Sequence, residues 1–364
     1  MSSTASLVFY ISSFMLAGFL MYFARKYRTP LATALSLVIP IAIASLRYDV
    51  GTDYYNYVNL FNQQVQIPFS RFLENYQFGQ EIGFYLLIKM SNIITGDVKF
   101  LFAFMSTMTV LFLYLGLRKM PIKHYALVYL MFLFTLFPNS LNIVRQAAAV
   151  SIFFYAFHFI VERKLIRYSL LILLASTLHV SALALLPLYL INRIIRPVGD
   201  RFSRAHIRVG IIALAISLAV PLALKVAGNL AVFSRYDLYQ SFTGSGGNYT
   251  FGLKIVIAFL CILFIRHLKV KSEIKMYLLF FKILEILLLS LGFTSSFTKR
   301  IALYFSPFSL LLLSSIPEAF EERSAKLASY GMILMYGVMF FYISFFVLGQ
   351  ADITPYRFII GKHE

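Results

Sequence analysis

The sequence predicts an all-α protein, a polytopic bundle of helices embedded in a membrane, and three observations support this fold class. Hydrophobic residues make up 60% of the 364 residues and charged residues only 13%, whereas soluble domains carry about 25% charged residues. The apolar residues gather in runs that approach the length needed to cross the hydrocarbon core of a bilayer. Short clusters of lysine and arginine separate many of these runs, as in the loops of membrane proteins.

Ten apolar runs are expected to cross the membrane, and two further runs are expected to enter and return on one side or to lie in the interface. The first run has no basic leader and no small-residue cleavage site, so it is expected to stay in the protein rather than to be removed as a signal peptide. Residues 1–364 are therefore expected to form a single membrane domain. The crossing runs are 5–24, 31–46, 99–117, 125–138, 142–161, 209–227, 251–266, 276–293, 301–317 and 327–348, and the returning runs are 82–94 and 168–192.

The basic clusters predict the orientation, because lysine and arginine are enriched in cytoplasmic loops. If one of the two returning runs crossed the membrane only once, every later cluster would change sides. Both termini are therefore expected to be extracytoplasmic, and the net charge of +18 reflects topology rather than nucleic-acid binding. The clusters expected inside are Arg25/Lys26/Arg28, Arg118/Lys119/Lys123, Arg163/Lys164/Arg167, Arg193/Arg196/Arg201/Arg204/Arg208, Arg266/Lys269/Lys271/Lys275 and Arg323/Lys326.

Five basic residues lie instead at the outer ends of predicted spans, where this rule disfavours them. They are Arg47, Arg145, Lys299, Arg300 and Arg357. Basic residues on the disfavoured side of the membrane need an explanation, and binding of an anionic ligand is one. The single cysteine, Cys261, excludes an intramolecular disulfide and a cysteine metal site.

The first polar stretch, "RYDVGTDYYNY" at 47–57, begins where the run 31–46 ends. Gly51 permits a turn, and Thr52 or Asp53 is placed to cap a helix over 54–62. Tyr54 and Tyr57 share the face of that helix near Asp53. The alternatives are a capped surface helix with interfacial tyrosines, or a metal site that pairs Asp53 with Asp49 and lacks a third ligand.

Two further stretches place polar groups at the outer face. Asn142, Arg145 and Gln146 stand at i, i+3 and i+4 and are expected on one helical face, where a guanidinium beside two amides suits a multi-oxygen anion. Glu81 opens the run 82–94, and a carboxylate there is either a partner of the helix dipole or part of a site. If the run 168–192 turns back, His179 lies at its tip, as a structural group or a proton acceptor.

Polar residues near the later runs extend the same set. Lys299 and Arg300 precede the run 301–317, with Tyr304 one turn further on, and the outer loop 228–250 carries Arg235. That loop either orders over a substrate or is only a connector. Lys282 and Glu285 are three residues apart within the run 276–293 and are expected to form a buried ion pair. Loops 47–98 and 228–250 are expected to build an outer pocket for an anionic, sugar-bearing lipid.

Six stretches, in this order, resemble the EpsG-type branch of the Wzy polysaccharide polymerases across nearly the whole chain: "RYDVGTDYYNY", "QEIGFYLL", "NIVRQAAAV", "LHVSAL", "FTKRIALY" and "TPYRF". The first stretch and the Arg145-Gln146 pair are the most specific parts of this resemblance. By this resemblance the residues at motif positions are Arg47, Gly51, Asp53, Tyr54, Glu81, Arg145, Gln146, His179, Arg300 and Tyr356.

The resemblance implies a multi-pass enzyme of the bacterial cytoplasmic (inner) membrane, which joins undecaprenyl-diphosphate-linked repeat units into O-antigen, capsule or exopolysaccharide. Asp53, Glu81 and His179 are the candidate proton acceptors, and Arg145 is expected to stabilise the leaving diphosphate. Substrate-binding roles are expected for Arg47, Tyr54, Tyr57, Asn142, Gln146, Arg235, Lys299, Arg300, Tyr304, Tyr356 and Arg357. No cofactor and no metal are expected.

The expected partners are the lipid-linked oligosaccharide, the bilayer, and a flippase and chain-length regulator of the same pathway. The alternatives are a flippase for the same lipid-linked sugar and a ligase that moves polymer to another acceptor. Gathering of the charges at one face favours an enzyme over a transporter, whose charged residues would lie near the midplane.

Overall fold

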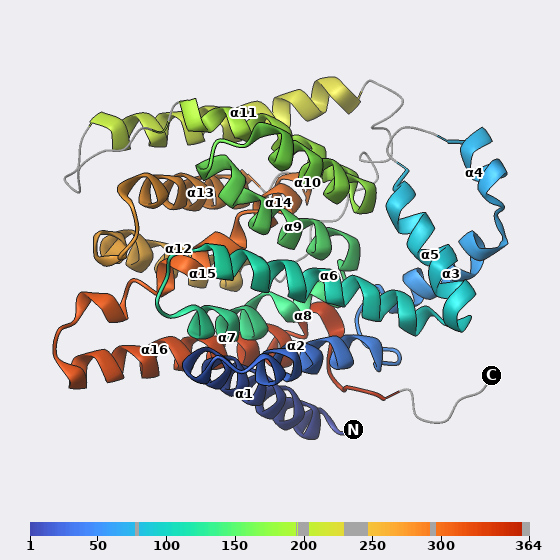
Figure 1. The fold of residues 1–364 in the computed structure, drawn as a ribbon, viewed down its shortest axis with the longest axis horizontal. Helices are drawn as coiled ribbons and strands as arrows, with labels where there is room; N and C mark the ends of the chain where they lie inside the picture. Colours follow the sequence, from blue (N-terminus) through green and yellow to red (C-terminus); the bar gives the residue numbers. More distant parts are fainter. Residues whose placement is uncertain (77–79, 194, 196–203, 229–246, 292–295, 359–364) are drawn as a thin grey trace.

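The computed structural model describes residues 1–76, 80–193, 195, 204–228, 247–291 and 296–358. Within these ranges all regular elements are helices, and one isolated antiparallel bridge joins Arg47 to Phe358. The all-α prediction is thereby confirmed. The long helices run roughly side by side along the longest axis of the molecule, while α3, α4 and α5 stand together at one end (Figure 1).

The helix bounds follow the apolar runs closely. The first half of the chain forms α1 Ser3–Tyr27, α2 Pro30–Ser45, α3 Tyr54–Gln66, α4 Phe69–Glu74, α5 Ile82–Thr95, α6 Val98–Lys119, α7 Tyr125–Thr135, α8 Phe137–Ser140, α9 Val144–Val161, α10 Leu165–Leu178 and the 3-10 helix η1 Val180–Arg193. The second half forms α11 Arg204–Gly228, α12 Gly247–Phe264, η3 Ile265–His267, α13 Ser272–Leu291, α14 Ser296–Leu303, α15 Ser306–Leu313, η4 Pro317–Ala319, α16 Arg323–Phe341, the π-helix η5 Tyr342–Val347 and η6 Gln350–Asp352.

Five helical stretches among the described residues are long and apolar enough to cross a membrane. They are Ser3–Tyr27, Val98–Lys119, Val144–Val161, Thr298–Ala319 and Arg323–Val347. The chain is therefore a multi-pass membrane protein. The spans expected at 31–46 and 125–138 are shorter helices, because α2 has 16 residues and α7 ends after 11.

The run 168–192 folds back on itself, and the run 82–94 forms the single helix α5. The Tyr168 hydroxyl, near the start of α10, donates a hydrogen bond to the carbonyl of Leu185 in η1 at 2.6 Å, so α10 and η1 form a hairpin with His179 at its tip. The end of α2 and the start of α6 lie at the same end of the bundle, because the guanidinium carbon of Arg47 is 4.4 Å from the Phe102 ring centre. Helix α5 therefore does not carry the chain to the other end.

Several of the basic clusters that were expected on one side meet at the opposite end of the bundle. Arg25 lies over the Tyr125 ring, 4.1 Å from its centre. The His124 imidazole lies 2.9 Å from the Tyr330 hydroxyl. It also interacts electrostatically with Lys326, Lys123 and Arg25. Desolvation, followed by these charges, lowers the pKa of His124. The shared location agrees with one common side for these clusters.

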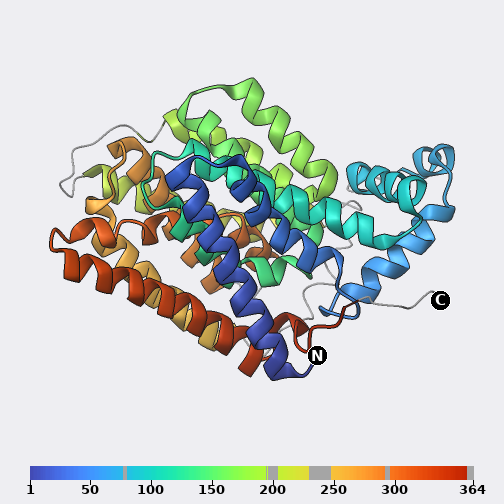
Figure 2. The same cartoon turned by 60° about the horizontal axis from the view of Figure 1, so that its bottom comes forward.

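A single apolar cluster runs through the whole bundle, from Tyr10 in α1 to Tyr356 near the end of the described chain. Helix α1 crosses the face of the bundle that Figure 2 brings forward. The rings of Phe153, Phe157, Phe281 and Phe308 pack against one another in edge-to-face or tilted contacts, with ring centres 4.6–6.1 Å apart. This packing fixes α9 against α13 and α15, and α9 carries one of the site residues.

The predicted ion pair within the run 276–293 is confirmed and is fully enclosed. Lys282 Nζ lies 3.0 Å from Glu285 Oε2, and both side chains are at most 3% exposed. Ser306 and Ser309 of α15 donate hydrogen bonds to the Glu285 carboxylate, so α13 is tied to α15.

Replacement of Lys282 by methionine is expected to destabilise the protein by about 3–5 kcal/mol, because it removes the cation that directly contacts the buried Glu285 carboxylate. The measurement is thermal or denaturant unfolding in detergent. The control is Lys164→Met, which breaks an exposed pair with Glu162 and should cost no more than about 1 kcal/mol. Equal effects of the two substitutions would contradict this account.

Candidate active site

Glu81 lies immediately before α5 and joins three segments that are far apart in the sequence. Its carboxylate forms an ion pair with Arg145 Nη1, 64 residues away. Its other oxygen lies 2.7 Å from Nδ1 of His179, 98 residues away, and accepts a hydrogen bond from the Val180 N–H at 3.3 Å. The Glu81 side chain is only 9% exposed. The structure therefore brings together three of the four predicted catalytic residues.

This arrangement determines which nitrogen of the His179 ring carries the hydrogen. An ionised carboxylate only accepts hydrogen bonds, so Nδ1 of His179 must carry the hydrogen that points to Glu81. In the neutral ring, Nε2 then carries the lone pair. A histidine held in one tautomer by a carboxylate is a proton acceptor with a defined orientation.

The pKa of the Glu81 carboxyl reflects two opposing effects. Burial raises it, but the hydrogen bond from His179 and the charge of Arg145 outweigh burial, so the net pKa lies below the ordinary glutamate value. A pKa that is lower in the folded protein than in the unfolded chain stabilises the fold at all pH values above the unfolded value. Glu81 is therefore a carboxylate at neutral pH.

The contribution of Glu81 to stability is expected to disappear only in acid. The difference in unfolding free energy between the wild type and Glu81→Gln should stay constant near neutral pH and shrink as the pH falls through the lowered folded pKa of Glu81. Thermal unfolding of both proteins across pH values measures this difference. A difference that already fades near neutral pH would contradict the assignment of Glu81 as a pre-ionised group.

The Arg145 side chain lies beside two aromatic rings and is partly exposed. Its guanidinium carbon lies 5.1 Å from the Phe84 ring centre and 5.8 Å from the Tyr57 ring centre. The side chain is 32% exposed, and its Nε is buried without a hydrogen-bond partner among the described residues. The partial exposure of the Arg145 side chain leaves it able to contact an external anion while it binds Glu81.

Gly83 allows α5 to approach α10 closely enough for Glu81 to reach His179. A Cβ at position 83 would lie 2.3 Å from Thr177 Oγ1 and 2.8 Å from Thr177 Cβ. Sequence reasoning missed this residue, although a glycine two positions after the glutamate in "EIG" was the available signal.

Gly83→Ala is expected to separate α5 from α10, to cost about 1–3 kcal/mol as an overpacked contact, and to reduce activity by displacing Glu81. Unfolding experiments and an activity assay of the same preparation measure both effects. The control is Gly331→Ala, where an added Cβ meets nothing within 4 Å. If Gly83→Ala behaves like Gly331→Ala, the close contact is not what positions Glu81.

The predicted common face of Asn142, Arg145 and Gln146 is wrong. Helix α9 begins at Val144, so Asn142 lies in the preceding turn, and the three side chains contact different segments. The Asn142 amide donates a hydrogen bond to the Ala351 carbonyl at 2.8 Å. The Gln146 amide donates one to the backbone carbonyl of Arg300 at 2.6 Å.

The stretch 47–57 is held by the last residues that the structure describes. The Gly51 N–H donates a hydrogen bond to the Asp352 carbonyl at 2.8 Å, and Asp49 forms an ion pair with Arg357. Gly51 has a φ of +100°, and a Cβ there would lie 2.4 Å from Asn142 Oδ1, so only glycine fits the turn. Residues 47–57, 142 and 351–357 thus form one connected layer beside the ion pair of Glu81.

Asp53 occupies the N-cap position of α3, as predicted, but its side chain makes no capping hydrogen bond. The carboxylate instead accepts a hydrogen bond from the Asn56 amide at 3.3 Å. The alternative of a metal site with Asp49 gains no support, because Asp49 binds Arg357 and the described part of the chain holds no group of three metal-ligating side chains.

A family model described as the EpsG family matches residues 31–358. This match covers most of the chain and spans the layer and the ion pair described above. The chain belongs to the EpsG family. Members of this family are associated with glycosyltransferase-like polysaccharide polymerases. Neither the curated proteins nor the solved structures include a match to this chain.

Four tyrosines predicted to bind substrate are buried in this EpsG family member. Tyr54 and Tyr57 are 3% and 6% exposed, and Tyr304 and Tyr356 are 0% exposed. The Tyr304 hydroxyl lies 2.9 Å from the Ser181 hydroxyl, and Tyr356 donates a hydrogen bond to the Ile43 carbonyl at 2.9 Å. These two tyrosines therefore connect the segments that carry the site, and contact with substrate stays a prediction.

The remaining predicted residues have different positions in the EpsG chain. Lys299 and Arg300 are partly exposed on α14, and Gln146 links that helix to α9. Arg357 is 49% exposed at the side chain, whereas Arg47 is almost completely buried at 1%. Arg235 and most of the loop 228–250 lie outside the described residues.

Proposed function

We propose that this EpsG family member is a polysaccharide polymerase, which joins undecaprenyl-diphosphate-linked repeat units at the outer leaflet of the bacterial cytoplasmic membrane. The observation that carries the proposal is the contact of Glu81 with both His179 and Arg145. This contact supports the proposal, because transfer of a sugar from an anionic leaving group to a hydroxyl requires a base and a cation close together. The proposal includes ten membrane crossings with both termini outside.

His179 is the proposed general base. Its Nε2 takes the proton from a hydroxyl of the incoming repeat unit, and that oxygen forms a bond to the anomeric carbon of the donor chain. The bond between this carbon and the diphosphate breaks at the same time. Glu81 keeps the ring in the required tautomer and stabilises the imidazolium that forms.

Arg145 is the proposed partner of the leaving diphosphate. Its partial exposure leaves it able to bind phosphate oxygens while Nη1 contacts Glu81. Lys299 and Arg300, which follow on α14, supply further positive charge next to Gln146. The proposal assigns charge neutralisation to these protein cations rather than to a metal ion.

A one-sided location of the charged groups favours a polymerase over a flippase. The connected layer and the ion pair lie at the end of the bundle that carries α3–α5, and no described site residue lies at the end where Arg25, Lys123 and Lys326 meet. A flippase would need a path between both ends.

The decisive experiment uses the purified protein in liposomes with lipid-linked repeat units and no transporter. A polymerase yields a ladder of longer lipid-linked chains. Movement of label across the bilayer without a ladder would identify a flippase, and transfer only to an added lipid A-core acceptor would identify a ligase. In the cell, the proposed partners are the flippase that supplies the units and a chain-length regulator.

A further inference from the structure

The side chain of Arg47 is buried without a hydrogen-bond partner. Arg47 is 1% exposed, and its Nε, Nη1 and Nη2 atoms are all enclosed with no acceptor among the described residues. Buried guanidinium groups normally pair with carboxylates or carbonyls, because an uncompensated charge in an apolar interior is costly. The absent counter-charge is the feature that points to a ligand.

The groups around Arg47 do not neutralise it. The titratable side chains whose charges act on Arg47 are Tyr10, Tyr54, Tyr57 and Tyr356. Burial raises the pKa of Tyr54 to about 12, so this phenol is neutral at physiological pH. Burial also lowers the pKa of Arg47, to about 10, which still leaves the guanidinium protonated near neutral pH.

The carboxylate nearest to Arg47 in the sequence and the carboxylate of the candidate active site each pair with another arginine. Asp49 pairs with Arg357, and Glu81 pairs with Arg145. The Phe102 ring, with its centre 4.4 Å from the Arg47 guanidinium carbon, attracts the cation. That ring nevertheless supplies no net negative charge and no hydrogen-bond acceptor.

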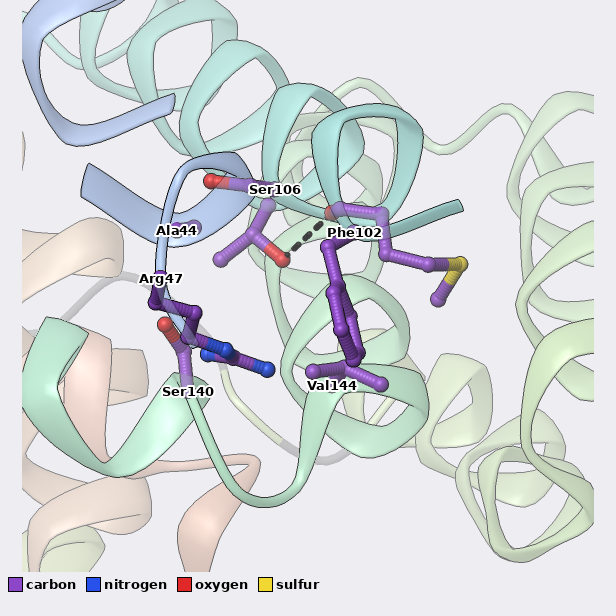
Figure 3. A pocket seen from close by; sticks show the side chains of 8 residues that line it. Ala44, Arg47, Phe102, Ser106, Ser140 and Val144 are labelled. Carbon is purple, nitrogen blue, oxygen red and sulfur yellow. Dashed lines mark hydrogen bonds between the residues drawn. The ribbon is translucent and has the colours of Figure 1, made fainter. Parts of the chain in front are cut away.

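The Arg47 guanidinium faces a small cavity between α2, α6 and the turn before α9. Figure 3 shows it pointing toward Val144 and the ring of Phe102. Ser106 lines the same cavity, and its hydroxyl also has no hydrogen-bond partner in the described structure. The cavity has room for one monatomic ion or a water molecule, but it is too small for a phosphate group or a sugar.

We propose that this cavity binds a small monovalent anion, chloride in the cell, on the Arg47 guanidinium. An anion supplies two things: an acceptor for the buried N–H groups and a negative charge that balances the guanidinium. A water molecule would supply only the acceptor. Because the cavity is too small for a phosphate group, this anion site is distinct from the proposed diphosphate site at Arg145.

The anion would also link the cavity to the candidate active site. Ser140 and Val144 line the cavity on either side of the turn 141–143, and Val144 directly precedes Arg145. An occupied cavity therefore stabilises the start of α9, where Arg145 is presented to Glu81. This consequence rests on the proposed function, whereas anion binding itself does not.

The first test compares the thermal unfolding of the full-length protein in detergent with chloride, bromide or gluconate as the sodium salt, at equal ionic strength. We expect a saturable rise in melting temperature with chloride and bromide and none with gluconate, which is too large for the cavity. Arg47→Met should abolish the rise, because it removes the cation. Lys123→Gln, an exposed charge at the opposite end, should retain it.

The second test needs no variant and applies even if Arg47→Met fails to fold. Crystals of the wild-type protein grown in bromide should give an anomalous peak within hydrogen-bond distance of the Arg47 guanidinium. An ordinary water there without an anomalous signal would overturn the proposal. Equal melting temperatures in chloride and gluconate, or the same chloride effect in Arg47→Met, would overturn it too. None of these results depends on polymerase activity.

Discussion

Replacement of His179 by alanine is expected to slow polymerisation by about 10²–10⁴-fold, which is the usual contribution of a positioned general base. The reason is the oriented Nε2 atom that results from the 2.7 Å contact between Nδ1 and Glu81. The measurement is the rate of ladder formation in liposomes with a saturating concentration of lipid-linked units. His124→Ala is the control, because this histidine lies at the opposite end and contacts Tyr330.

Glu81 is a positioning residue in this account, so its substitution should act through His179. Glu81→Gln is expected to lower kcat more than it raises KM, since the amide keeps the shape but loses the charge that favours the imidazolium. In the double variant with His179→Ala, the loss should be close to that of His179→Ala alone. Additive losses would show that Glu81 and His179 act separately, and normal chain growth in His179→Ala would remove histidine from the mechanism.

Replacement of Arg145 by alanine is expected to reduce polymerisation by about 10²–10³-fold, the size reported for a lost donor to developing negative charge. Cells with this variant should accumulate lipid-linked single repeat units and lack long polymer. The substitution also leaves the Glu81 carboxylate without its cation, so stability must be measured beside activity.

Arg145→Lys separates binding from positioning. Lysine keeps the positive charge near Glu81 but loses the planar fork that binds phosphate oxygens in pairs. We expect normal unfolding with a large loss of rate for this variant. Unchanged polymer length in Arg145→Ala would defeat the assignment, and full activity of Arg145→Lys would show that the cation only holds Glu81 in place.

The sequence predicted the residues of the site better than it predicted their arrangement. Glu81, Arg145 and His179 were all singled out, because each is a polar group at the outer end of an apolar run. Their mutual contacts could not be read from local patterns, since the partners lie 64 and 98 residues apart. Such contacts depend on how α5, α9 and α10 pack, which in turn depends on small details such as the absence of a side chain at Gly83.

One prediction was wrong because a spacing rule was applied across a turn. Helical spacing placed Asn142 beside Arg145, but the chain turns at residues 141–143 after the short helix α8, so the spacing rule does not extend across that turn. The sequence placed Arg47 at the end of an apolar run but gave no sign that its side chain is buried. The segment 352–358, which is distant in sequence, packs over residues 47–51.

Composition and apolar run length by themselves determined the class of this protein, because helix formation in a membrane depends on local hydrophobicity and on backbone hydrogen bonds within each helix. The basic clusters predicted a common end for their loops, and Arg25, Lys123 and Lys326 do lie near one another. Tertiary structure alone decided which polar groups meet, which are buried and which keep a free donor. These properties come from contacts between distant segments, and their energies depend on close packing that no local pattern records.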